Sequence, residues 1–145
     1  MTRKLALLFG VSMIGAAGLG YAAHHEMAGM MKPGNHVEWQ DMGPDSPLKM
    51  TVLFGDPATG ESVRMFKLPG GHVVPVHMHT GDYHAVNLAG TWRHSFDGGE
   101  ELELPPGSYV FQPGKEMHGD ACVGPDDCVI WIYQSVAADF IPKEQ

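Results

Sequence analysis

Residues 71–84, Gly-His-Val-Val-Pro-Val-His-Met-His-Thr-Gly-Asp-Tyr-His, decide the fold and place most of the chemistry in this chain. The first part of the stretch is expected to be an extended strand. Side chains two residues apart on a strand point to the same face, so His77 and His79 are predicted to point the same way. His84 follows a short Thr-Gly-Asp turn, where the next strand should begin.

A second stretch, residues 107–118, reads Gly-Ser-Tyr-Val-Phe-Gln-Pro-Gly-Lys-Glu-Met-His and supplies His118. Three or four imidazoles that converge from different strands suit a divalent transition metal. We therefore predict that His77, His79 and His118 are metal ligands. His84 is a fourth candidate, either as a ligand or as a base above the site. A site built from histidines alone fits zinc, copper, nickel or iron better than manganese, and should favour an anionic substrate.

The two stretches resemble the two motifs of the cupin superfamily. The first motif reads glycine, five residues, His-x-His, three or four residues, glutamate and, further on, glycine. The residues that match it are Gly71, His77, His79 and Gly90. His84 stands at the glutamate position when the longer spacing is used, and Tyr83 stands there when the shorter one is used.

The second motif is matched by Gly107, Pro113 and His118. Its inner glycine position falls on Lys115, and its closing asparagine position falls on Cys122. The chain is most similar to small single-domain bacterial cupins of the ChrR-like group. The resemblance covers most of the chain and implies an all-β fold: a single jelly-roll-like, double-stranded β-helix barrel that binds one metal ion.

The resemblance leaves several functions open. Some relatives bind zinc in a regulator of a sigma factor, and others are iron dioxygenases with a three-histidine site. The chain is therefore expected to be a metalloenzyme, with dioxygenase-like or Lewis-acid chemistry on a small oxygen-rich substrate. The alternatives are a non-catalytic module that binds or senses a metal or small ligand, and a periplasmic metal-handling protein.

An enzyme of this kind needs a proton-transfer group, and no carboxylate base is evident from the motifs. The catalytic candidates are therefore His84, Tyr83 and His94. His94 is expected to share a strand face with Trp92 and Phe96, where it would line the cavity or face solvent.

The N-terminus has the pattern of a secretory signal. Arg3 and Lys4 precede an uncharged run, and Gly20-Tyr21-Ala22 is a small-x-small cleavage site. We predict a signal peptide over residues 1–22, a flexible arm rich in histidine and methionine over residues 23–36, and the barrel domain over residues 37–145. An uncleaved membrane anchor and a copper-binding arm are the alternatives. Export would place the protein in the periplasm or outside the cell.

The length and net charge of the chain limit the kinds of binding partner that are expected. The chain has 145 residues, enough for one domain, and a formal net charge of −8. No basic patch is evident, which argues against nucleic acid, and no membrane association is expected after signal cleavage. A small molecule is the expected partner. A homodimer could form through an added edge strand near Val37.

Two further residue placements follow from the sequence. Cys122 and Cys128 flank the turn-forming residues Val-Gly-Pro-Asp-Asp, and in an oxidising compartment we expect them to form a disulfide. The alternative is that Cys122 is a metal ligand or a reactive thiol. Arg64, on the strand expected over residues 62–68, is predicted to point outward.

Overall fold

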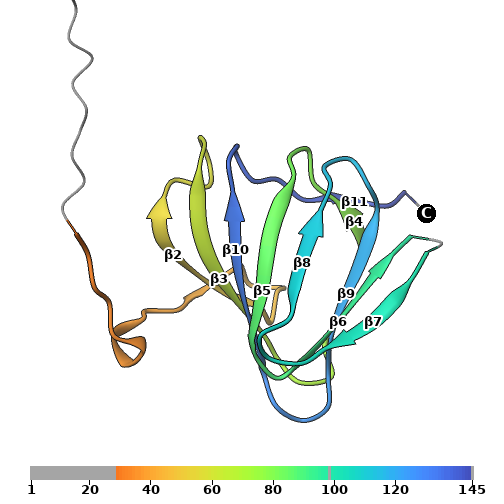
Figure 1. The fold of residues 1–145 in the computed structure, drawn as a ribbon, viewed down its shortest axis with the longest axis horizontal. Coiled ribbons are helices and arrows are strands. Elements are labelled where there is room, and N and C mark those ends of the chain that lie inside the picture. The colour runs from red at the N-terminus through yellow and green to blue at the C-terminus, as the bar shows by residue number, and fades with distance from the viewer. Residues whose placement is uncertain (1–28, 98, 145) are drawn as a thin grey trace, which may run out of the picture. The chain divides into compact units, whose positions relative to one another are not determined.

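The computed structural model describes residues 29–97 and 99–144, shown as a ribbon in Figure 1. The chain forms two units with separate internal contacts, Met1–Met31 and Lys32–Gln145. All strands of the described residues belong to the second unit. The predicted signal peptide, residues 1–22, and residues 23–28 of the predicted arm lie outside the described residues. Within the described part of the chain, no helix is long and apolar enough to cross a membrane.

Regular structure in the described residues is almost entirely β. One 3₁₀ turn, η1 (Gly34–His36), lies within the predicted arm and is followed by the strands. The strands are β1 (Gln40–Asp41), β2 (Lys49–Gly55), β3 (Ser62–Leu68), β4 (Val73–Met78), β5 (Tyr83–Ala89), β6 (Thr91–Phe96), β7 (Glu101–Leu104), β8 (Tyr109–Gln112), β9 (His118–Val123), β10 (Cys128–Gln134) and β11 (Ile141–Pro142). The prediction of an all-β fold is confirmed.

The strands form two antiparallel sheets that face each other across one interior (Figure 1). The six-stranded sheet has the order β1-β2-β3-β10-β5-β8, and the five-stranded sheet has the order β11-β4-β9-β6-β7. From β3 onward the chain passes repeatedly from one sheet to the other, in the manner of a jelly roll. This path makes β4 and β9 neighbours, so the two histidine-bearing stretches of the sequence meet in one sheet.

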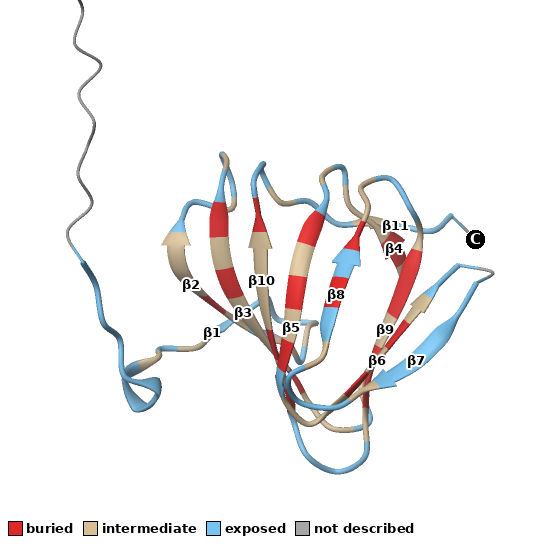
Figure 2. Cartoon of the chain, in the orientation of Figure 1, coloured by how far each residue is buried: buried red, intermediate tan, exposed pale blue. Residues whose placement is uncertain are grey.

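Alternation along the strands separates an inner face from an outer one, as the red and tan bands in Figure 2 show. On β3, Arg64, Phe66 and Leu68 share the inner face, and Arg64 is buried. The prediction that Arg64 points outward is therefore wrong. Side chains on a strand alternate between the two faces, so residues an even number of positions apart share a face. Arg64 is four residues from Leu68, which faces the core, and three residues from Lys67, which faces outward.

The core lies between the sheets and gathers around the middle of the strands. Its buried apolar members are Leu68, Tyr83, Ala85, Trp92, Val110, Cys122, Cys128 and Ile130. Partly buried side chains pack against them at the margins: Leu48, Phe66, Val74, Leu104 and Ile132.

The turn before β9 explains how this chain departs from the second motif. Lys115, at the motif's inner glycine position, has a φ of 65°, in the left-handed region where a lysine is strained. Its amide donates to the carbonyl of His79 at 2.7 Å, which holds the turn against the histidine-bearing stretch. The preceding residue, Gly114, must be small, because a Cβ there would meet the Thr80 carbonyl oxygen at 2.5 Å.

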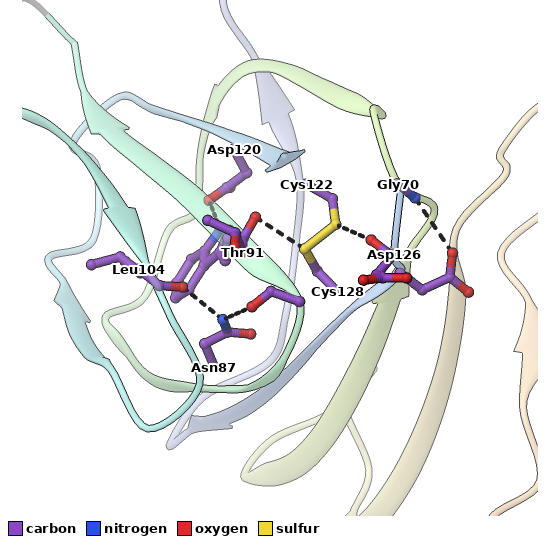
Figure 3. The surroundings of a disulfide bond; sticks show 11 residues. Gly70, Asn87, Thr91, Leu104, Asp120, Cys122, Asp126 and Cys128 are labelled. Carbon is purple, nitrogen blue, oxygen red and sulfur yellow. Dashed lines mark hydrogen bonds between the residues drawn. A yellow bond between two sulfur atoms is a disulfide. The ribbon is translucent and has the colours of Figure 1, made fainter. Parts of the chain in front are cut away.

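Cys122 and Cys128 form a disulfide between β9 and the start of β10 (Figure 3). Their Cα atoms are 5.6 Å apart, and both side chains are buried in the core. The predicted disulfide is confirmed, and the alternative of Cys122 as a metal ligand or a free thiol is wrong.

Loss of this disulfide should destabilise the fold without preventing folding. The bridge closes a short loop of sequence separation 6, for which the chain-entropy model gives about 2 kcal/mol. We expect the double variant Cys122→Ala/Cys128→Ala to lose roughly that free energy of unfolding, measured by urea denaturation, with the wild type under reducing conditions as a matched control. An unchanged denaturation midpoint in both samples would contradict the expectation.

Candidate metal centre

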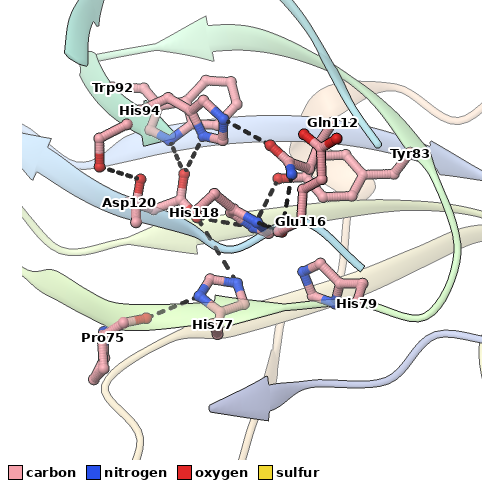
Figure 4. Close-up of polar contacts among 12 residues, drawn as sticks. Pro75, His77, His79, Tyr83, Trp92, His94, Gln112, Glu116, His118 and Asp120 are labelled. Carbon is pink, nitrogen blue, oxygen red and sulfur yellow. Dashed lines mark hydrogen bonds and ion pairs between the residues drawn. The ribbon is translucent and has the colours of Figure 1, made fainter. Parts of the chain in front are cut away.

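The three predicted ligand histidines meet at one point of the five-stranded sheet. His77 lies near the end of β4, His79 just beyond that strand, and His118 opens β9, where it is directly paired with His77. A register shift between Val74 and His77 precedes the site, and such irregularities re-aim side chains. One ring nitrogen of each histidine lies within 4.8 Å of those of the other two (Figure 4).

Backbone carbonyls fix which nitrogen of each ring carries the proton. The Nδ1 of His77 lies 2.8 Å from the Pro75 oxygen, that of His118 lies 3.3 Å from the Glu116 oxygen, and that of His79 bonds the Asp139 oxygen. A carbonyl oxygen only accepts, so each Nδ1 donates its proton. Each Nε2 then carries a lone pair, and that of His118 accepts a hydrogen bond from the Tyr83 hydroxyl at 3.2 Å. Hydrogen bonds that hold the other ring nitrogen in this way orient metal-binding histidines. The donor set therefore fits a transition metal with three protein ligands and an open position.

The environment also keeps these rings neutral, as ligands must be. Burial lowers the pKa values of His77 and His79. Burial lowers the pKa of His118 to about 4, against an opposing effect of the Asp120 charge. All three imidazoles are therefore neutral at neutral pH and need not lose a proton to bind a metal.

These lowered pKa values predict a loss of stability in acid for the metal-free protein. Between the ordinary pKa near 6.5 and the folded-state pKa of about 4, the unfolded chain binds more protons at His118 than the folded one. Stability must therefore fall as the pH drops through this window, by roughly 2–3 kcal/mol for His118. Urea denaturation of the chelator-treated protein at a series of pH values measures it. A free energy of unfolding that is flat from pH 7 to 4 would contradict the expectation.

Asp120, which sequence reasoning missed, connects the histidines to a second polar group. Its Oδ1 accepts hydrogen bonds from Trp92 Nε1 at 2.8 Å and from His94 Nδ1 at 2.9 Å (Figure 4). Its Oδ2 lies 3.9 Å from His77 Nε2 and 3.8 Å from His118 Nε2. A signal was present in the sequence, because His118-Gly119-Asp120 has the same spacing as His77-Met78-His79.

Asp120 supplies negative charge to the centre. Burial alone would raise the pKa of its carboxyl, but the hydrogen bond from His94 and the nearby histidines outweigh burial, and the pKa is lowered. The carboxylate is therefore ionised next to the Nε2 atoms of His77 and His118. It places an anionic oxygen in the position of an outer-shell partner, close enough to stabilise a bound cation.

His94, a predicted catalytic candidate, lies behind Asp120. Its Nε2 lies 3.1 Å from Gln112 Oε1, and that amide is oriented by donating to the carbonyls of Pro113 and Glu116. Both ring nitrogens of His94 thus face oxygen atoms, of Asp120 on one side and of Gln112 on the other. The structure places His94 where it positions Asp120 rather than against the ligand nitrogens.

Tyr83 lies directly beside the three histidines. Its hydroxyl is 3.2 Å from His118 Nε2, and its side chain is buried. Burial raises the pKa of this phenol well above its usual value, and the Asp120 charge acts in the same direction. The hydroxyl therefore keeps its proton and is a hydrogen-bond donor at the centre, directed to His118 Nε2 in this structure.

The structure does not bring His84 to the other three histidines. His84 follows Tyr83 on β5, so alternation turns its side chain to the outer face of the sheet. There its Nδ1 lies 2.7 Å from the Tyr109 hydroxyl, and its ring packs near Phe111 and Tyr133. The glutamate position of the motif is thus filled on the inside by Tyr83, as the shorter spacing allows.

The metal centre opens into a cavity of about 710 Å³ between the sheets. His77, His79, Tyr83 and Asp120 form part of its wall. The remaining lining is mostly apolar and includes Leu48, Met50, Phe66, Leu68, Val74, Trp92, Ile130 and Ile132. Its size and its few polar groups are typical of a site for a small organic molecule.

The segment before β11 covers one side of the centre. Phe140 stacks on the His77 ring, with centroids 4.3 Å apart and planes inclined by 24°. The Asp139 carboxylate accepts a hydrogen bond from the Thr80 amide at 2.8 Å, next to the bond that its carbonyl accepts from His79. This segment therefore holds His79 in place and shields His77 from water.

Comparisons with known proteins agree with this architecture. The model of the ChrR cupin-like domain matches residues 28–137. The polyketide cyclase RemF from Streptomyces resistomycificus has a TM-score of 0.65 at 22% identity, over 80% of this chain and 87% of that chain. KdgF from Halomonas sp. has a TM-score of 0.59 at 24% identity, over 71% of this chain and 92% of that chain.

A structure of the DMSP lyases RdDddP and RnDddQII has a TM-score of 0.63 at 18% identity, covering 75% of this chain and 63% of that chain. None of the curated proteins matches the sequence. At these identities the likeness establishes a shared fold, and the prediction of a single cupin barrel is confirmed.

Proposed function

Since the chain belongs to the family of ChrR cupin-like domains, we propose that it is an exported metalloenzyme that acts on a small oxygen-rich substrate. The observation that carries this proposal is the meeting of three histidine ring nitrogens beside a largely apolar cavity of about 710 Å³, with His77 and His79 in the cavity wall. A site that served only to hold the fold together would not need such a cavity beside an open coordination position.

Each residue of the centre has a distinct part in this proposal. His77, His79 and His118 would hold one divalent transition metal, which acts as a Lewis acid on a carbonyl or enolate oxygen. The Tyr83 hydroxyl lies beside His118 Nε2 and donates a hydrogen bond to the substrate oxygen there. Asp120 balances part of the positive charge, and His94 holds Asp120 in place.

Relatives of the same fold support a catalytic role in general terms. A polyketide cyclase and DMSP lyases share this barrel, so the fold accommodates chemistry on small molecules. The substrate of this chain must be argued from its own cavity, because the shared fold leaves the reaction open.

Export is the second part of the proposal. The predicted signal peptide supports it, and so does the buried disulfide, since disulfides persist in oxidising compartments such as the periplasm or the extracellular space. The negative charge of the chain favours a small molecule over nucleic acid as the partner. A homodimer stays a prediction.

Elemental analysis of the protein purified without added metal, followed by turnover assays with carbonyl compounds, tests the function. Iron near one equivalent would direct the assays to oxygen uptake, and zinc, nickel or copper would direct them to redox-neutral conversion followed by mass spectrometry. We expect turnover that disappears in His79→Ala. A metal-loaded wild type that binds small molecules but converts none of them would instead support the non-catalytic binding module.

A further inference from the structure

Arg64 is a buried cation without an anionic partner. It lies on the inner face of β3 and is only 7% exposed. Among the described residues, no carboxylate lies within ion-pair distance of it, although Asp45, Asp120 and Asp139 also line the cavity. Charged groups are rarely buried in this way unless they are paired, because removing a charge from water is costly.

The neutral contacts of Arg64 leave part of its guanidinium unused. Its Nη2 donates to the Gln134 side-chain oxygen at 2.6 Å, and its carbon lies 5.5 Å from the centre of the Phe66 ring. Its Nε is buried and has no hydrogen-bond partner among the described residues. A guanidinium is built to bind a carboxylate through its N–H groups, but here its one side-chain partner is a neutral amide oxygen. Because Arg64 lines the cavity, the charge lacks an anionic partner on that side.

Arg64 and the metal centre share one cavity. Arg64 lines the same space as His77, His79 and Tyr83, and it is close enough to Tyr83 for its charge to oppose the rise in that phenol's pKa. Most of the other lining residues are apolar, Phe66, Ile130 and Ile132 among them. A ligand that satisfied both ends would carry an anionic oxygen group, an apolar body and a second oxygen for the metal.

Resting on the proposed function, we propose that Arg64 binds the carboxylate of the substrate, which is therefore an apolar organic acid. Arg64 is a binding residue that orients the acid, with its apolar body against Phe66 and the isoleucines and its far oxygen toward the three histidines. The wall residues exclude water, which strengthens the ion pair in the cavity.

Titration calorimetry on the chelator-treated, metal-free protein tests Arg64 separately from the metal. The probes are phenylalkanoic and medium-chain fatty acids, each paired with its neutral amide. We expect the wild type to bind at least one acid more tightly than its amide. Arg64→Gln should weaken that acid by roughly 10- to 150-fold, since a hydrogen bond to a charged group contributes about 1.5–3 kcal/mol, and should leave amide binding unchanged.

Lys67→Gln is the matched control, because it removes the same charge from the outer face of the same strand, where Lys67 lies over the Trp39 ring. It should leave acid binding unchanged. Thermal melting of each variant checks folding, and Arg64→Met, which also removes the charge, replaces Arg64→Gln if that variant does not fold. A wild type that binds acid and amide equally, or no acid, would overturn the proposal, and so would an Arg64 variant with unchanged acid binding. A failure here leaves the metal-dependent turnover test untouched.

Discussion

Replacement of His79 by alanine should cost the protein its metal while leaving the β-sandwich folded. His79 would contribute one of the three ligand nitrogens of the proposed centre, and two imidazoles alone cannot hold a divalent ion against chelation. The loss of affinity should exceed the roughly 10- to 100-fold that follows the loss of an outer-shell partner. His79 lies beyond the end of β4 and is only partly buried, so the variant should keep its β-type circular dichroism. Metal content after dialysis against a weak chelator measures the effect.

His84→Ala is the matched control for this prediction. This variant also removes an imidazole, and His84 is close to His79 in the sequence. The His84 side chain, however, lies on the outer face of the sheet, where it contacts Tyr109. This variant should retain one equivalent of metal. If His84→Ala lost its metal and His79→Ala kept it, the centre would be assigned to the wrong histidines.

Replacement of Asp120 by alanine should have the largest effect on stability. The carboxylate lies in the interior beside His94 and accepts a hydrogen bond from Trp92 Nε1. Its removal leaves the His94 ring and the indole N–H without an acceptor in the core. A buried donor left without its acceptor costs about 1–3 kcal/mol, so the loss of two acceptor contacts should cost roughly 2–6 kcal/mol. Urea denaturation of the metal-free variant, compared with metal-free wild type, measures the loss.

Asp120→Asn separates the hydrogen bonds from the charge. The amide oxygen can still accept from Trp92, so the loss of stability should be smaller than in the alanine variant. The negative charge beside His77 and His118 is gone, so metal affinity should fall by roughly 10- to 100-fold, as for other outer-shell partners. If Asp120→Ala and Asp120→Asn were both as stable as the wild type, the buried contact between Asp120 and His94 would contribute little to stability.

The sequence predicted the parts of this site that follow from strand alternation within a single segment. His77 and His79 share a face because they are two residues apart, and the second stretch delivers His118 to the neighbouring strand. The disulfide was predictable for a similar reason, since Cys122 and Cys128 flank a turn in a chain that begins with the pattern of a secretory signal. Each of these predictions needs only local geometry and one strand pairing.

The errors came from positions where local geometry allowed two answers. The motif spacing fitted both His84 and Tyr83, and only the start of β5 decides which of the two faces inward. The positive charge of Arg64 suggested that its side chain faces solvent. Side-chain alternation along β3 instead places it on the same face as Phe66 and Leu68. A buried cation is tolerated there because it lines a cavity, and a cavity depends on how two sheets are spaced, which no local pattern encodes.

Asp120 shows a further limit of sequence reasoning. Its spacing to His118 was visible, but its role depends on Trp92 and His94, which lie on β6, the strand next to β9. His94 and Asp120 were both visible in the sequence. The register of β6 against β9 brings their side chains together, because it places His94 directly opposite Asp120.

Anomalous diffraction from a crystal of the metal-loaded protein tests the central claim most directly. The account predicts one strong peak, about 2.0–2.2 Å from the Nε2 atoms of His77, His79 and His118, at the wall of the cavity. A peak at His84 and Tyr109 on the outer face, or no peak in a crystal soaked with zinc or cobalt, would contradict it.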